Sequence, residues 1–92
     1  MPSLSDLTAK RPIEPQSGSL EAYQRQMAFW DLHIEPEITV LTKVISTQPK
    51  RENFEDENDF EESWHFWMGR QGRAVGMRLS RALRIWDDFS NK

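Results

Sequence analysis

Residues 59–89 of the chain read DFEESWHFWMGRQGRAVGMRLSRALRIWDDF, and this stretch decides the fold. Its large apolar residues recur every three or four positions, so at about 100° per residue they share one side of a helix. This apolar stripe consists of Phe60, Trp64, Trp67, Met68, Val75, Leu79, Ala82, Leu83 and Trp86. The stretch therefore predicts one long helix over about residues 59–88, capped by Asn58 or Asp59.

Three glycines, Gly69, Gly72 and Gly76, interrupt this stretch. The apolar stripe keeps its phase through them, which favours one helix, kinked at most, and the alternative is a flexible break between two shorter helices. Each glycine costs about 1 kcal/mol relative to alanine in a helix, and all three lie on one shoulder of the stripe, where small residues let another helix approach. We assign helix packing to the glycines together with the stripe residues Trp64, Trp67, Leu79, Leu83 and Trp86.

Two shorter helices are predicted upstream. One apolar stripe, formed by Leu20, Tyr23, Met27, Trp30 and Ile34, predicts a helix over residues 19–34 with Ser19 as its N-cap. Pro36 predicts a break, because the residue before a proline is pushed out of the helical region. Residues 37–47 fit a helix or a strand, and we favour the helix because no second convincing strand could pair with them.

The remaining segments carry no apolar period. Residues 1–18 contain Pro2, Pro12, Pro15 and Gly18 and are predicted to form an extended arm. Residues 48–58 are polar and predict an acidic linker. The sequence therefore predicts an all-α domain over residues 19–92, with an extended N-terminal arm, two short helices and one long C-terminal helix.

The composition excludes several classes of protein. With 92 residues, 37% of them apolar and 29% charged, the chain has the balance of one small folded domain. It contains no cysteine, which excludes disulfides, thiolate metal sites and a cysteine nucleophile. Because no apolar run reaches the roughly 18 residues that a membrane span needs, and the first residues lack a secretory core, we expect a cytoplasmic location and no membrane partner.

The net charge of −3 hides a strong segregation of charge. Residues 52–62 hold seven acids and no base, whereas residues 63–86 hold five arginines and no acid. The arginines lie opposite the apolar stripe, and arginine is preferred where a planar group binds carboxylate or phosphate in two parallel bonds. We therefore predict a partner-binding surface formed by Arg70, Arg73, Arg78, Arg81 and Arg84, with Phe66 and Met77 among them. The alternatives are a solvated or intrachain-paired face and a contact with nucleic acid, against which the net negative charge argues.

Ten aromatic residues are more than two or three helices can enclose, and this excess favours self-association or a protein partner. A metal site has only weak support. Glu62 and His65 have the i, i+3 spacing of helical carboxylate–histidine ligands, but no further ligand is evident, so we predict neither metal nor cofactor. No arrangement resembles a nucleophile elbow or a catalytic triad, and we predict a protein that is not an enzyme.

These features favour a small accessory protein that binds another macromolecule, either as a subunit of a larger assembly or as an inhibitor or adaptor. Small phage-encoded proteins that block a host machine have a similar size and composition. A second hypothesis is a nucleic-acid-contacting subunit that uses the arginine face of the long helix. A third is a helical protein that binds metal through carboxylate and histidine.

Overall fold

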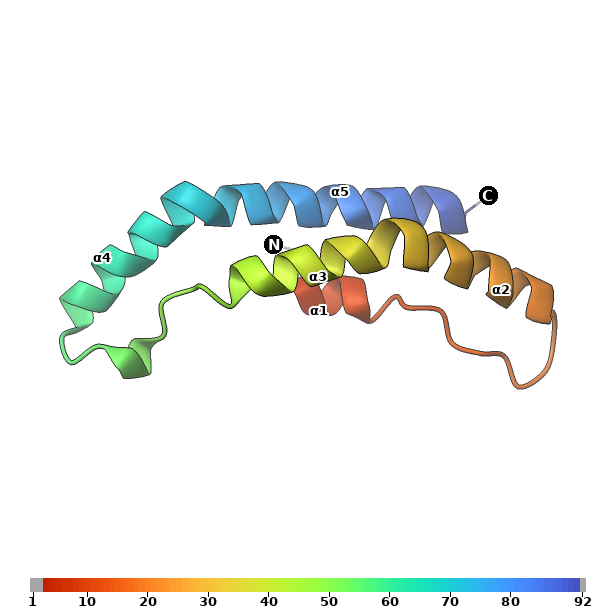
Figure 1. Ribbon diagram of the computed structural model, residues 1–92, viewed down its shortest axis with the longest axis horizontal. Coiled ribbons are helices and arrows are strands. Elements are labelled where there is room, and N and C mark those ends of the chain that lie inside the picture. The colour runs from red at the N-terminus through yellow and green to blue at the C-terminus, as the bar shows by residue number, and fades with distance from the viewer. Residues whose placement is uncertain (1–2, 92) are drawn as a thin grey trace.

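Two long helical runs, Leu20–Ile45 and Glu57–Ser90, lie side by side as a hairpin in the computed structural model (Figure 1). A short helix, α1 (Leu4–Thr8), packs against both of them. The structure describes residues 3–91, and in this range every regular element is helical. The predicted all-α fold is therefore confirmed.

The first run joins α2 (Leu20–Phe29), a π-helical turn η1 (Trp30–Ile34) and α3 (Glu35–Ile45) without a break. The hydroxyl of Ser19 accepts the N–H of Ala22, so Ser19 is the N-cap as predicted. The break predicted at Pro36 is wrong. A proline has no N–H to donate four residues back, but here the wide turn just before it has already left the α-helical bonding pattern. Pro36 therefore occupies the first turn of α3, where its missing donor costs little, and residues 37–47 are helical through Ile45.

The prediction that residues 1–18 are extended is also wrong in part, because α1 lies within them. The Ser3 hydroxyl accepts the N–H of Asp6, and the Asp6 carboxylate accepts the N–H of Ser3, which together form a capping box. Leu7 is fully buried against the two long runs. Ser3-x-x-Asp6 was the signal in the sequence, and the flanking prolines obscured it.

The second run joins α4 (Glu57–Trp67), a π-helical turn η3 (Met68–Gly72) and α5 (Arg73–Ser90). The long C-terminal helix is therefore confirmed, and the glycine segment is a π-helical turn within it. The predicted caps are wrong, because the helix begins at Glu57 and Asp56 is the N-cap that accepts the N–H of Asn58. The predicted linker 48–58 accordingly overlaps the helix by two residues and contains a short 3-10 turn, η2 (Arg51–Asn53).

The hydrophobic core lies between α1, the first run and α5. Its buried members are Leu7, Trp30, Ile34, Leu41, Leu79, Ala82 and Trp86. The Trp30 and Trp86 rings meet edge to face at 5.1 Å, and the Trp30 indole N–H donates to the Glu35 carboxylate at 2.8 Å. Burial of this tryptophan therefore leaves no polar group unpaired.

The molecule is elongated, with extents of 55 × 23 × 19 Å and a radius of gyration of 17.0 Å. A compact chain of this length would have a radius of gyration of about 12 Å. Helix α4 slants away from the line of α5 at one end of the hairpin (Figure 1). Across the described part of the chain, no helix combines the length and apolarity needed to cross a membrane. Much of the helical surface is consequently open to contact with other molecules.

Candidate functional site: an arginine-lined groove on the long helix

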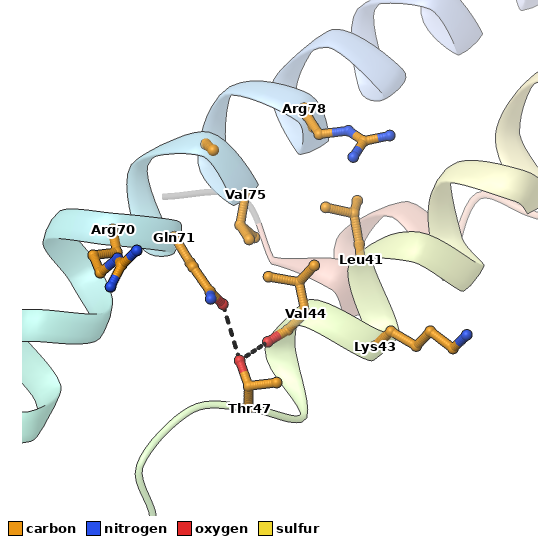
Figure 2. A pocket seen from close by; sticks show the side chains of 9 residues that line it. Leu41, Lys43, Val44, Thr47, Arg70, Gln71, Val75 and Arg78 are labelled. Atoms are coloured by element: carbon orange, nitrogen blue, oxygen red, sulfur yellow. Dashed lines mark hydrogen bonds between the residues drawn. The ribbon is translucent and has the colours of Figure 1, made fainter.

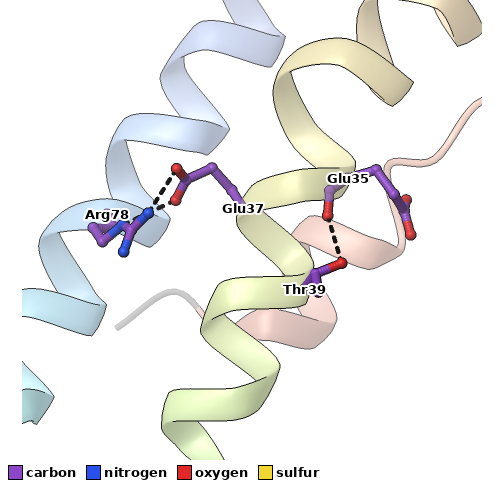
Figure 3. A network of polar contacts seen from close by, with 4 residues as sticks. All are labelled: Glu35, Glu37, Thr39 and Arg78. Carbon is purple, nitrogen blue, oxygen red and sulfur yellow. Dashed lines mark hydrogen bonds and ion pairs between the residues drawn. The ribbon is translucent and has the colours of Figure 1, made fainter.

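One of the five predicted arginines is used inside the chain. Arg78, on α5, donates two parallel hydrogen bonds to the Glu37 carboxylate on α3, at 3.0 and 2.9 Å (Figure 3). These bonds and the charge of Glu37 raise the pKa of the Arg78 guanidinium above its ordinary value. The pair links α5 to α3 across the hairpin, which gives Arg78 a structural contact in addition to its place on the predicted face.

Arg70 is also engaged, although only by a local contact. Its guanidinium lies over the Phe66 ring, 5.4 Å from the centroid, in a cation–π arrangement. Both side chains are exposed, and Phe66 keeps 65% of its surface in solvent. The two residues together present a flat, positively charged and apolar surface at the start of the π-helical turn.

The other three arginines are free. Arg73, Arg81 and Arg84 are exposed and form no ion pair with any acid among residues 3–91. They border an open groove of about 1100 Å³ that runs along η3 and α5. The groove is lined by Met68, Gly69, Gly72, Arg73, Gly76, Met77, Arg78, Ser80, Arg81 and Arg84. The structure thus brings the three predicted glycines and four of the five predicted arginines, all except Arg70, into one open groove, hereafter the arginine groove.

The glycines of this groove differ in their surroundings. A Cβ atom added to Gly69 or Gly76 would meet nothing within 4 Å, whereas one added to Gly72 would lie 2.5 Å from the Met68 sulfur and 3.2 Å from the Trp67 ring. A side chain at position 72 would therefore have to displace the Met68 and Trp67 side chains of its own helix. Gly69 and Gly76 each cost about 1 kcal/mol of helix propensity, and no contact within the described chain requires them.

The stripe residues assigned to helix packing divide into two groups. Leu79 and Trp86 are buried in the core, and Leu83 is half-buried against it. Trp67 is buried outside that core, where its indole N–H donates to the Thr47 hydroxyl at 2.8 Å. Trp64 is half-buried on the slanting helix α4.

A chain of aromatic rings follows α4. Phe54 meets Phe60 at 5.8 Å, Phe60 meets Trp64 at 6.3 Å, and Trp64 stacks on Trp67 at 5.9 Å between centroids. Apart from Trp67, these side chains are only half-buried. The aromatic face of α4 is therefore partly open to solvent.

The acidic run surrounds the start of α4. Its members are Glu52, Glu55, Asp56, Glu57, Asp59, Glu61 and Glu62, and all are exposed. One of them, Glu57, pairs with Arg51 at 3.0 Å, and no other ion pair of this run occurs within residues 3–91. The acids near the helix start complement the helix dipole, but most of their charge is available to a partner.

A second, smaller cavity lies where the end of α3 faces η3 and the start of α5 (Figure 2). Its volume is about 340 Å³, and Leu41, Val44 and Val75 form its apolar wall. The Thr47 hydroxyl contacts the Gln71 side chain at 3.0 Å across its mouth. Its lining contains neither a carboxylate nor an imidazole, so it holds no acid–base pair. Sequence patterns could not reveal this cavity, because it depends on which face of α3 meets the π-helical turn.

The weak candidate for a metal site is the pair Glu62 and His65 on α4. Both are exposed, and among residues 3–91 no group of three or more acidic or histidine side chains is placed to hold a metal ion. The other imidazole, His33, packs against the Phe29 ring at 4.6 Å on the first helical run. Within the described range the structure brings no third ligand to Glu62 and His65.

Comparisons with known proteins found no matching family, and searches of curated proteins and of solved structures also found no match.

Proposed function

We propose that this chain is a non-enzymatic binding protein whose arginine groove docks onto an acidic helical surface of another protein chain, as a subunit or adaptor of a larger assembly. The observation that carries the proposal is the set of free arginines. The chain contains 15 acids, yet Arg73, Arg81 and Arg84 pair with none of them in the described range. A partner that supplies carboxylates would satisfy all three.

The energetics of the groove fit a protein surface. A charge-assisted hydrogen bond contributes about 1.5–3 kcal/mol when its partners are partly desolvated, and a guanidinium makes two such bonds to one carboxylate. Met77, 69% exposed within the groove, adds apolar area, and full burial of such a side chain contributes about 1.5–3 kcal/mol. Groove arginines and an apolar anchor together are typical of the centre of a protein interface.

Nucleic acid is a poorer partner for this surface. The net charge is −3, and seven exposed acids lie in the loop before α4 and at the start of α4, upstream of the groove in the sequence. Binding to a phosphate backbone depends on positive potential over a broad footprint, and these acids oppose it. The carboxylates of a protein partner can be confined to the positions that face the arginines, whereas a continuous phosphate chain that leaves the groove also passes the acids.

The test is capture of partners from the source cells in physiological salt, before and after nuclease treatment. The variant Arg73→Gln/Arg81→Gln/Arg84→Gln should lose the partner that the wild-type chain retains. The control Arg11→Gln/Arg25→Gln/Lys50→Gln removes the same charge at exposed positions outside the groove, and it should retain that partner. Equal capture by both variants would contradict the proposal.

Lysine replacements at the same three groove positions separate protein from nucleic acid. Lysine keeps the charge but loses the planar fork, so a carboxylate contact made through paired bonds should weaken while phosphate attraction largely survives. Loss of capture after nuclease treatment, with retention by the lysine variant, would identify a nucleic-acid partner.

A further inference from the structure

We infer that a second copy of this chain supplies the acidic helix, and that two copies cross antiparallel at Gly69–Gly72 with α4 of each lying along the arginine groove of the other. The inference rests on the proposed function, because it names the partner of the same groove. It follows from the order of charges along one continuous helix, from the unexplained glycines and from the amount of exposed surface.

The charges and anchors of the helix are placed symmetrically about the glycine segment. Glu57 precedes Gly69 by 12 residues, and Arg84 follows Gly72 by 12 residues. A twofold axis through the middle of this segment, perpendicular to two antiparallel helices, therefore places Glu57 of each copy opposite Arg84 of the other. The twofold arrangement makes every such contact twice.

Two further pairs lie at or next to the same register. Glu61 precedes Gly69 by eight residues and faces position 80, so Arg81 is one residue from exact register and its long side chain can reach Glu61 of the other copy. Trp64 precedes Gly69 by five residues and Met77 follows Gly72 by five. An exposed thioether therefore meets a half-buried indole close to the axis, which is a favourable sulfur–aromatic contact. Apolar contacts at the centre with charge pairs outside them are the usual layout of a protein interface.

The acidic side of α4 lies on the same face of the second helical run as the arginine groove. The π-helical turn inserts one extra residue between α4 and α5, which shifts the helical phase by that residue. Counted at about 100° per residue with this shift, Glu61 lies within about 40° of both Gly76 and Arg84. One face of the second run therefore carries acids at one end, glycines in the middle and arginines at the other end.

The glycines permit the crossing that this arrangement needs. Gly69 and Gly76 have open space where a Cβ would be, so no contact among residues 3–91 accounts for them. Helix axes pack at 8–10 Å when ordinary side chains separate them, and smaller residues allow a closer approach. A second helix that lies over Gly69 and Gly76 is the neighbour for which the missing side chains make room.

The exposed area is large enough to supply a dimer interface. The chain exposes 7147 Å², whereas a compact monomer of its mass would expose about 5,600 Å². A stable interface of standard size buries roughly 800 Å² on each partner. Each copy could bury that area on the second run and still expose as much surface as a compact monomer does.

Sedimentation equilibrium of the purified full chain tests the inference, with reversed charges at the two ends of the face. The wild-type chain should have twice its monomer mass of 10.9 kDa. Glu57→Arg/Glu61→Arg and Arg81→Glu/Arg84→Glu should each sediment as monomers, because like charges then face each other twice. An equal mixture of the two variants should regain the dimer mass, because every facing pair is again attractive. A monomeric wild-type chain, or two variants that remain dimeric alone, would overturn the inference.

Cross-linking through engineered cysteines gives a second readout that does not depend on reversed charges. Position 61 of one copy faces position 80 of the other in this arrangement, both residues are exposed, and the chain has no cysteine of its own. Glu61→Cys mixed with Ser80→Cys should form a disulfide-linked dimer on oxidation, while each variant alone should give far less. Equal yields in all three samples would also overturn the pairing.

Failure of the inference can be distinguished from failure of the proposed function. The wild-type chain could be monomeric while the triple variant of the groove arginines still loses a captured protein. In that case the groove would remain a binding site, but for a different partner. A dimer that forms and survives every groove substitution would remove both proposals.

Discussion

Arg78 is bound to Glu37 through two parallel hydrogen bonds, and this pair is the polar link between α5 and α3 in the middle of the hairpin. Both side chains keep substantial contact with water, so salt screens the pair and its contribution to stability is small. The pair nevertheless distinguishes Arg78 from the other arginines of the same helix, which form no ion pair within residues 3–91. Arg73, Arg81 and Arg84 remain the free cations of the arginine groove.

The first prediction follows from this difference. Arg78→Gln and Glu37→Gln should each lower the melting temperature slightly, and the double variant should lower it no more than either change alone, because each removes the same contact. Arg81→Gln should leave the melting temperature unchanged. Thermal melts followed by circular dichroism at low salt provide the measurement, and additive losses in the double variant would show that the two residues act separately.

The second prediction concerns the phase of α5. Leu79→Ala removes a side chain that is almost fully buried in the core and should lower the free energy of unfolding by about 2–5 kcal/mol. Met77→Ala, two residues away on the exposed side, should change it little. Urea denaturation of the two variants checks this contrast, and equal losses would mean that the helix is rotated relative to the core.

The third prediction concerns the N-terminal segment. Leu7→Ala should cost about 2–5 kcal/mol, because Leu7 is fully buried between the two helical runs. Ser3→Ala should cost about 1 kcal/mol through loss of the helix cap. Ile13→Ala is the control, since Ile13 is 88% exposed. If denaturation midpoints of all three variants equal that of the wild-type chain, α1 contributes nothing to the fold.

The fourth prediction separates the glycines. Gly76→Ala should stabilise the fold of the single chain by up to about 1 kcal/mol, because alanine is the better helix former and its Cβ meets open space within the chain. Gly72→Ala should gain less or lose stability, because its Cβ would push against the Met68 sulfur. Gly76→Leu should keep the helix content and weaken association, because the larger side chain fills the groove. A variant that melts higher and still associates at wild-type strength would show that Gly76 has no role in close approach.

The long-range periodicity of the sequence was a reliable guide to the second helical run. The apolar stripe from Phe60 to Trp86 predicted one helix through the glycines, and the arginines fell on its opposite side. The same periodicity placed Phe66 and Met77 away from the stripe, and both are exposed. Phe29 also lies off its stripe, yet it stacks on Phe89 at 3.9 Å, because the end of α5 comes back against α2.

The remaining features depend on contacts that a local pattern cannot contain. A proline usually interrupts a helix. At Pro36, however, the π-helical turn before it and the packing of both flanks against α5 preserve the helix. The sequence around Leu7 shows no apolar period, because α1 is short and is held in place by the burial of Leu7 in the core. The pairing of Arg78 with Glu37, 41 residues apart, required knowledge of how α3 and α5 align. For the same reason, the sequence could not separate one structural arginine from three free ones.

Photo-cross-linking in the source cells is the most direct measurement of whether the arginine groove is the binding surface. A photoreactive phenylalanine derivative placed at Met77 samples the arginine groove, and the same residue at Leu32 samples an equally exposed site on the first helical run, since their exposed fractions are 69% and 70%. We expect a discrete adduct from position 77 with a protein that carries an acidic helix, and we expect the adduct to disappear when Arg73, Arg81 and Arg84 are replaced by glutamine. An adduct of twice the monomer mass would identify the second copy. Strong cross-linking from position 32 with none from position 77 would contradict the assignment of the arginine groove as the binding surface.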